Sequence, residues 1–149
     1  GQIVFDTSDA SYQFAHEYIS LQRYSWGNDE HKLRFTIFAE ALKKALEIGL
    51  IKEEEFYGTE KEVVSKLENS NNKFIIDKLD LLIKGFIIKY NVHNGVRVRG
   101  KFRFVNPEVL VNEGMKRLSE IDSFYSPYLR LQKELFDEIK YVEIISKWT

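Results

Sequence analysis

The first 86 residues carry apolar side chains at helical spacing, separated by short polar stretches. Apolar residues that recur every three or four positions form one face of an amphipathic helix. The pattern predicts four helices, over residues 8–24, 30–48, 59–69 and about 75–86. Thr59 and Glu62 form a capping box at the start of the third helix, and Gly49 is expected to end the second. A short strand is expected before the first helix, at residues 2–6.

The pattern changes from helical to alternating at about residue 87. Residues 87–90 are rich in β-prone side chains, a turn follows at 93–95, and residues 96–105 alternate with period two. This arrangement predicts a hairpin-like pair of strands. A helix over 123–139 and a last strand over 141–146 are expected to follow. The helix is expected to bury four residues at helical spacing, namely Tyr128, Leu131, Leu135 and Ile139.

These elements indicate an α+β fold in two parts. We expect a helical subdomain over residues 1–86 and an α+β subdomain, with the basic strand described next, over residues 87–149. The second part is predicted to be a small antiparallel sheet with one packed helix. The sequence contains no internal repeat and no low-complexity segment that would change this division.

One predicted strand, in the stretch NGVRVRGKFRF, has a regular pattern of positive charge. Alternate side chains of a strand share a face, so four cations would line one side of it. These cations are Arg97, Arg99, Lys101 and Arg103. Val98, Phe102 and Phe104 would lie on the other side, where we expect them to pack against the helix over 123–139. The pattern leaves open whether the basic face meets water, a neighbouring subunit or a nucleotide phosphate.

Composition limits the partners that such a face could have. The chain has 22 basic and 23 acidic residues and a net charge of −1, so it is not built to coat nucleic acid. A binder of single strands also needs aromatic and basic side chains on one surface, which this strand does not offer. No apolar run reaches the roughly 20 residues of a membrane-spanning helix, and there is no cysteine. We therefore expect a cytoplasmic protein without membrane contact, for which nucleic acid is disfavoured.

The sequence contains no recognisable catalytic or metal-binding motif. Its three histidines lack the spacing of metal ligands, and His16 and His93 are interpreted as surface or locally hydrogen-bonded residues. The acidic run at 53–55 is interpreted as the first turn of a short helix, where carboxylates suit the helix dipole. Three other residues, Arg23, His31 and Arg34, flank the loop around Trp26. They could converge as an anion-binding cluster, or they could form salt bridges with Glu17, Asp29 and Glu30.

Several segments together resemble a known family. Residues 15–51, AHEYISLQRYSWGNDEHKLRFTIFAEALKKALEIGLI, resemble the region downstream of the metal site in HD-superfamily phosphohydrolases, including the deoxyguanosine triphosphate triphosphohydrolase-like branch. The residues that match are Arg23-Tyr24, Trp26, His31 and Arg34. KFRFVNPEVLV and KRLSEID, at residues 101–111 and 116–122, resemble stretches of the family's C-terminal subdomain. The linker from Arg23 to His31 is shorter than is usual in the family.

The metal ligands that define the family, an early His, a His-Asp doublet and a later Asp, are absent from this sequence. The resemblance therefore implies a fragment whose HD core, with its divalent metal, lies upstream in the same polypeptide. Gly1 is interpreted as a residue left by cloning. On this hypothesis the chain completes the substrate pocket, supports oligomerisation and is inactive alone. By position in the family pattern, Arg23, Tyr24, His31 and Arg34 are the candidate phosphate or nucleotide contacts.

Two other functions stay open from the sequence. The chain could be a stand-alone binding or regulatory module whose basic strand meets an anionic partner. It could also be a plain oligomerisation domain that forms a homo-oligomer. The residues do not decide whether the chain has enzymatic activity. We expect the chain itself to bind no metal and no cofactor.

Overall fold

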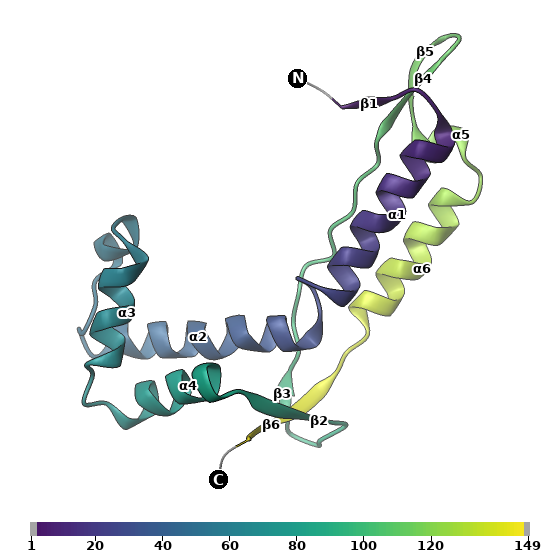
Figure 1. Cartoon of the computed structure of the whole chain (residues 1–149). Coiled ribbons are helices and arrows are strands. Elements are labelled where there is room, and N and C mark those ends of the chain that lie inside the picture. Colours follow the sequence, from purple (N-terminus) through teal and green to yellow (C-terminus); the bar gives the residue numbers. More distant parts are fainter. Residues whose placement is uncertain (1–2, 148–149) are drawn as a thin grey trace. The chain divides into compact units, whose positions relative to one another are not determined.

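The computed structural model of the chain describes residues 3–147 and has an α+β fold, as predicted (Figure 1). The chain divides into two compact units, each built from separated stretches of sequence. Unit 1 comprises Gly1–Asn28 and Gly100–Ile139, and unit 2 comprises Asp29–Arg99 and Lys140–Thr149. The elements in chain order are β1 (Val4–Phe5), α1 (Ser8–Tyr24), α2 (Asp29–Glu47), the 3-10 helix η1 (Glu53–Tyr57), α3 (Glu60–Glu68), α4 (Lys73–Lys84), β2 (Phe86–Tyr90), β3 (Val96–Arg97), β4 (Glu108–Val111), β5 (Gly114–Arg117), α5 (Leu118–Ile121), α6 (Tyr125–Asp137) and β6 (Tyr141–Ser146).

Unit 1 is built around the pairing of α1 with α6, which lie side by side (Figure 1). The hydroxyl oxygen of Thr7 caps α1 by accepting a hydrogen bond from the Ala10 N–H at 3.2 Å. The buried centre of the unit is formed by one residue each from α1, α5 and α6, namely Ala15, Leu118 and Tyr125. The small side chain of Ala15 lets the aromatic rings of α6 approach α1 closely.

A three-stranded sheet completes unit 1, with strand order β1-β4-β5. Strand β1 runs parallel to β4, with Val4 opposite Glu108, and β4 forms an antiparallel hairpin with β5. The strand expected at residues 2–6 is therefore present at Val4–Phe5, while residue 2 lies outside the described residues. The hairpin and the short helix α5 were not predicted from the sequence, because only Val109 of β4 is buried and the apolar alternation is weak.

Unit 2 contains the helices α2, α3 and α4, whose bounds lie within a few residues of the predicted ones. Gly49 follows α2 with a φ of +69°, a conformation that favours glycine, and it ends the helix as predicted. The helices enclose a core whose members are buried: Ala41, Ala45, Ile51, Val63, Leu67, Ile75 and Leu79. The acidic run at 53–55 begins η1, in agreement with the short helix expected there.

The sheet of unit 2 is antiparallel, with strand order β2-β6-β3. Leu33 and Ile37 of α2 pack on Phe86 and Val142 of this sheet, and all four are buried. Gly95 precedes β3, and a Cβ at this position would lie 2.6 Å from the Val142 carbonyl oxygen. The absence of a side chain at Gly95 therefore lets the turn approach the central strand closely.

The predicted hairpin between residues 87–90 and 96–105 is wrong. Strand β6 lies between β2 and β3, and each of these strands pairs with β6. The predicted basic strand is also wrong in length, because β3 ends at Arg97. Beyond Arg97 the backbone forms other hydrogen bonds: the Val98 N–H donates to the Lys140 carbonyl at 2.9 Å, and residues 101–103 bond to a side chain described below.

The predicted packing of the basic segment is partly wrong for the same reason. The Phe102 ring lies 5.6 Å from that of Phe136 on α6, as predicted. Phe104 is half exposed and stacks on Phe102. Val98 packs instead in unit 2, against the cluster of Leu33 and its neighbours.

The predicted buried face of α6 is wrong. Tyr125 is fully buried and Leu129 packs against the same cluster, whereas Leu131, Leu135 and Ile139 are exposed. Tyr128 lies at the border of the two faces and is partly buried. The contact face is turned by about a quarter of the helix from the apolar face that the sequence pattern favoured. The rings of Tyr125 and Tyr128 on α6 lie 6.2 and 6.3 Å from the Tyr12 ring on α1, so the aromatic side of α6 is the one that contacts α1.

The two units do not follow the division at residue 86 that the sequence indicates. The last strand, β6, pairs with β2 and β3 and so joins the helices of unit 2. The first helix, α1, packs with α6 in unit 1. Both pairings join residues far apart in sequence, which local patterns do not encode. None of the helices in the described residues is long and apolar enough to cross a membrane.

Candidate functional site

The four candidate phosphate contacts are divided between the two units. Arg23 and Tyr24 end α1 in unit 1, and the Arg23 guanidinium lies over the Tyr24 ring, 5.4 Å from its centroid. His31 and Arg34 lie in the first turns of α2 in unit 2. Arg23 and Tyr24 thus contact each other within unit 1, and His31 and Arg34 lie one helical turn apart within unit 2.

Arg34 is engaged within unit 2. Its Nε and one terminal nitrogen donate to Glu30 Oε1 at 3.0 and 2.9 Å, and the other terminal nitrogen donates to the Leu82 carbonyl at 2.9 Å. The guanidinium also lies over the Phe86 ring, 5.5 Å from its centroid. For Arg34 the structure therefore contains the ion pair with Glu30 that the sequence offered as the alternative to anion binding. This residue ties α2 to the end of α4.

The guanidinium of Arg23 donates fewer hydrogen bonds than that of Arg34. The side chain is exposed, and a terminal nitrogen of its guanidinium donates a hydrogen bond to Gln132 Oε1 at 3.3 Å. A neutral amide at that distance leaves the guanidinium able to bind an anion with its other donors. Of the candidate residues, Arg23 is the best placed for a phosphate.

Asp29 is a polar centre that the sequence pattern did not single out as a site. Its carboxylate accepts from Lys140 Nζ at 2.8 Å and from the Tyr90 hydroxyl at 3.2 Å, and Lys32 Nζ lies 3.5 Å away. Partial burial on its own raises the pKa of Asp29, but Lys140, Lys32 and Tyr90 outweigh it and hold the pKa below its ordinary value. The contacts join the start of α2 to the last residue of β2 and to the residue before β6, so Asp29 has a structural role in unit 2.

Gln22 holds the basic segment in unit 1. This α1 residue is buried, its Nε2 donates to the Lys101 carbonyl at 2.9 Å, and its Oε1 accepts from the Arg103 N–H at 2.9 Å. The side-chain amide thus takes the place of a neighbouring strand. We call these two bonds the Gln22 clamp. It explains how residues 101–103 stay extended without belonging to a sheet.

The four cations of the segment are exposed, as expected. Arg97 and Arg99 belong to unit 2, and Lys101 and Arg103 to unit 1. Within residues 3–147, none of the four forms an ion pair with a carboxylate. They are available to an anionic partner, but the structure does not define one surface that carries all four.

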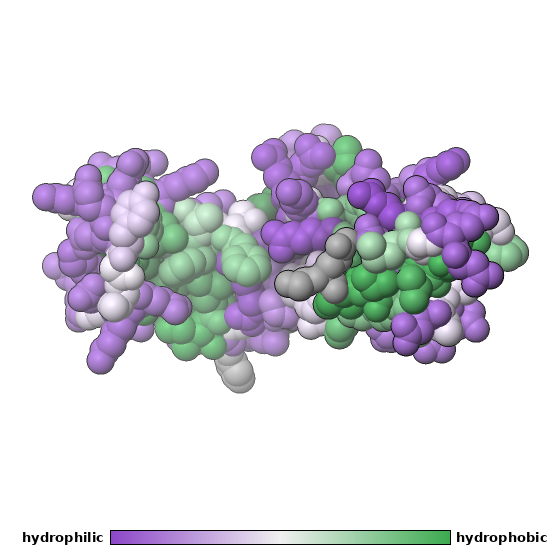
Figure 2. All heavy atoms as spheres, turned by 90° about the horizontal axis from the view of Figure 1, so that it is seen from above, coloured by the Kyte–Doolittle hydropathy of each residue, from purple (hydrophilic) through white to green (hydrophobic). Residues whose placement is uncertain are grey.

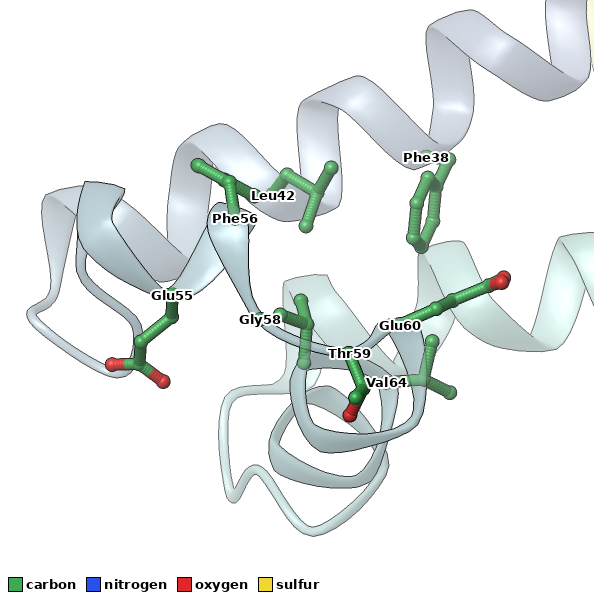
Figure 3. A pocket seen from close by; sticks show the side chains of 9 residues that line it. Phe38, Leu42, Glu55, Phe56, Gly58, Thr59, Glu60 and Val64 are labelled. Carbon is green, nitrogen blue, oxygen red and sulfur yellow. The ribbon is translucent and has the colours of Figure 1, made fainter.

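The described residues of unit 2 also form a pocket of about 310 Å³ between α2, η1 and α3 (Figure 3). Phe38, Leu42 and Phe56 contribute apolar side chains, and Thr59 and Glu60 lie at the start of α3 beside it. The sequence did not single out this pocket. The sequence of α2 did indicate such a surface, because Phe38 and Leu42 make the apolar face of this helix wider than one neighbouring element can cover.

No group of three or more His, Cys, Asp or Glu side chains in residues 3–147 is placed to hold a metal ion. The divalent metal that the family resemblance implies belongs to the HD core upstream of this chain, and we derive no chemical step through it. His16 belongs to unit 1, where its ring stacks on that of Tyr128 with the ring centroids 5.5 Å apart.

Comparison of the chain with protein-family models, curated proteins and solved structures found no match.

Proposed function

We propose that the chain is an accessory region of an HD-type metal-dependent phosphohydrolase that acts on nucleotides or phosphate esters. In this proposal the chain packs against the HD core of the same polypeptide, completes the substrate pocket and supports oligomerisation, and it has no activity alone. The core holds the divalent metal and carries out the hydrolysis. The proposal starts from the motifs around Arg23 and residues 101–122 that resemble that family.

One observation in the structure carries the proposal. Phe124, Leu131 and Leu135 are 77%, 52% and 43% exposed, and their spacing of seven and four residues puts them on one side of α6. We call these three residues the α6 stripe. Apolar helix faces are normally covered by another element. A region that packs on a larger core exposes such a face when the core is not present. The HD core is therefore the partner that we propose for the α6 stripe.

Arg23 and Tyr24 are the substrate contacts in this proposal. A guanidinium stacked on an aromatic ring has a restricted orientation and still presents donors to a phosphate. Arg34 is given a supporting role, because its donors are occupied by Glu30 and Leu82. His31 lies one turn before Arg34 and stays a candidate contact in this proposal.

The sequence upstream of Gly1 in the parent gene tests the proposal most directly. A His, a His-Asp doublet and a later Asp are expected there. Hydrolysis of deoxynucleoside triphosphates with Mn²⁺ is then expected for the full-length parent and not for this chain alone. A parent without those ligands, or an active isolated chain, contradicts the proposal.

Replacement of Arg23 by alanine in the full-length parent is expected to lower kcat/KM about tenfold, a loss of about 1.4 kcal/mol of binding or transition-state energy. The hydrogen bond to Gln132 is exposed and weak, so the melting temperature is expected to change by less than about 2 °C. Arg130→Ala, an exposed change on α6, is the control and is expected to keep both values. Unchanged kinetics in Arg23→Ala would show that this residue does not contact substrate.

The basic segment supports a second candidate, a binding module for an anionic partner, because its four cations form no ion pair within residues 3–147. We expect weak binding of a fluorescent 20-nucleotide duplex or single strand at 20 mM salt if this is the function. The affinity should then fall steeply with salt, because each phosphate contact releases counterions. No measurable binding at 20 mM salt removes nucleic acid from the candidates.

A further inference from the structure

The pocket of unit 2 has apolar walls from three elements (Figure 3). Phe38 and Leu42 come from α2, Phe56 from η1, and Val63 and Val64 from α3. Gly58 lies in the connection between η1 and α3 and leaves its part of the pocket without a side chain. The lining side chains are thus mostly apolar, and its polar members are Glu55 of η1 and the residues Thr59 and Glu60 at the start of α3.

This apolar surface continues beyond the pocket. Phe56 is 47% exposed, and Tyr57, the last residue of η1, is 94% exposed. Figure 2 shows apolar patches among charged side chains. Aromatic side chains exposed beside an apolar pocket are frequent where proteins bind a partner.

The surroundings of the pocket are acidic. The stretch from Lys52 to Glu62 contains five glutamates and two lysines. Glu55 is paired with Lys66, and Glu62 accepts from the Thr59 N–H in the capping box. The other three carboxylates, at positions 53, 54 and 60, form no ion pair with a residue of the described chain.

Glu60 lies closest to the apolar side chains. It is the first residue of α3, and Figure 3 shows its side chain extending from the start of the helix toward the space beside the Phe38 ring. The Glu55 carboxylate turns away from Leu42 and Phe56, and its salt bridge to Lys66 occupies it. An occupant of the pocket would therefore meet Glu60 as its nearest unpaired charge.

We propose that this pocket binds a basic peptide segment of a partner protein, with one large apolar side chain as the anchor. The anchor fits against Phe38, Leu42 and Phe56, and a Lys or Arg next to it pairs with Glu60. The acidic surroundings select a cationic segment over a neutral or acidic one, because unlike potentials favour association and like charges oppose it. A volume of about 310 Å³ is enough for one aromatic or aliphatic anchor.

Selection from a phage-displayed library of random 12-residue peptides on the immobilised chain tests this proposal. Selected peptides are expected to share a Leu, Met, Phe or Trp within one helical turn of a Lys or Arg. A synthetic peptide of the consensus should then bind in fluorescence polarisation at 50 mM salt. Selection of sequences without basic residues contradicts the proposal.

Three variants locate the binding site. Val64→Arg fills the pocket and is expected to weaken the consensus peptide at least tenfold. Glu60→Lys reverses the charge at the rim and should weaken binding about tenfold, while Glu68→Lys makes the same change on α3 away from the pocket and should alter affinity less than twofold. Circular dichroism establishes that each variant is folded. Equal affinity of Glu60→Lys and Glu68→Lys overturns the charge argument, even if Val64→Arg fails to fold.

A further experiment tests whether the pocket binds a second copy of this chain. Sedimentation equilibrium of the chain and of Glu60→Lys is expected to give the same oligomeric state, since the partner is a different protein. A dimer that is lost in Glu60→Lys but kept in Glu68→Lys would assign the pocket to contacts between copies of this chain and would overturn the proposal.

Discussion

Replacement of Gln22 by leucine is expected to lower the free energy of unfolding of unit 1 by about 2–4 kcal/mol. The leucine fills a similar volume, but it removes both bonds of the Gln22 clamp. The Lys101 carbonyl and the Arg103 N–H are then left partly buried without partners, at about 1–3 kcal/mol for each unsatisfied group. The loss therefore comes from the backbone of the basic segment more than from α1.

Gln13→Leu is the matched control, because Gln13 is an exposed residue on the same helix. Urea denaturation followed by circular dichroism should give a change below about 0.5 kcal/mol for Gln13→Leu. Hydrogen exchange should also show faster exchange of the Arg103 amide in Gln22→Leu. A loss of less than about 0.5 kcal/mol with unchanged exchange at Arg103 would show that the clamp contributes nothing to stability.

The Gln22 clamp fixes the backbone on both sides of Phe102. Phe102 packs on Phe136, and the neighbouring Lys101 and Arg103 are exposed. Over residues 101–103 a partly buried side chain thus stands between two exposed ones without a strand ladder. Alternation in the sequence predicted a strand here, although period two reports the direction of side chains and not the hydrogen-bond partner of the backbone.

The helices were predictable because their signals are local. α1 begins and ends where the sequence indicates, since Thr7 supplies an N-cap and the apolar period stops at the Trp26 loop. The turn at Gly49 and the capping box at Thr59 likewise act within a few residues. Strand β6 was also predicted with its correct bounds, residues 141–146.

Pairing over long distances was not predictable. The partners of β6 are β2 and β3, and nothing local distinguishes this order from a hairpin of β2 with β3. The predicted buried face of α6 was wrong for a related reason. Leu131 and Leu135 are more apolar than Tyr125, yet Tyr125 is the buried residue, and its hydroxyl donates to the backbone carbonyl of Val105. A hydrophobic pattern indicates which residues can be buried, and the geometry of the neighbour decides which of them are.

The candidate site was predictable only in part. Arg23 and Arg34 have the same residue type and flank the same loop, but Arg34 is occupied by Glu30 and Leu82. The pair Glu30 and Arg34 has the spacing of a helical salt bridge, so this alternative was readable from the sequence. The contact with Leu82 and the pocket beside Phe38 join separate elements and needed the structure.

The stability of unit 1 is expected to fall by as much as about 2–3 kcal/mol between pH 10 and pH 12 because of Tyr125 alone. Burial, with smaller effects of Tyr128 and Tyr12, raises the pKa of Tyr125 from 10.0 to about 12. The unfolded chain loses this proton near pH 10, while the folded chain keeps it until about pH 12. In this interval the unfolded state binds fewer protons, so the stabilising contribution is complete below pH 10 and is lost as pH rises through 12.

Tyr125→Phe isolates the effect, since it removes the titrating group and keeps most of the ring packing against Ala15 and Leu118. Below pH 10 this variant should be less stable than the wild type by about 1 kcal/mol, because the hydroxyl no longer donates to the Val105 carbonyl. The difference between the two proteins, from urea denaturation at each pH, should shrink and then reverse between pH 10 and 12. Tyr57→Phe, at a residue that is 94% exposed, is the control and should follow the wild type throughout. A wild-type minus Tyr125→Phe difference that stays constant to pH 12 would mean that the Tyr125 hydroxyl reaches water in the folded protein.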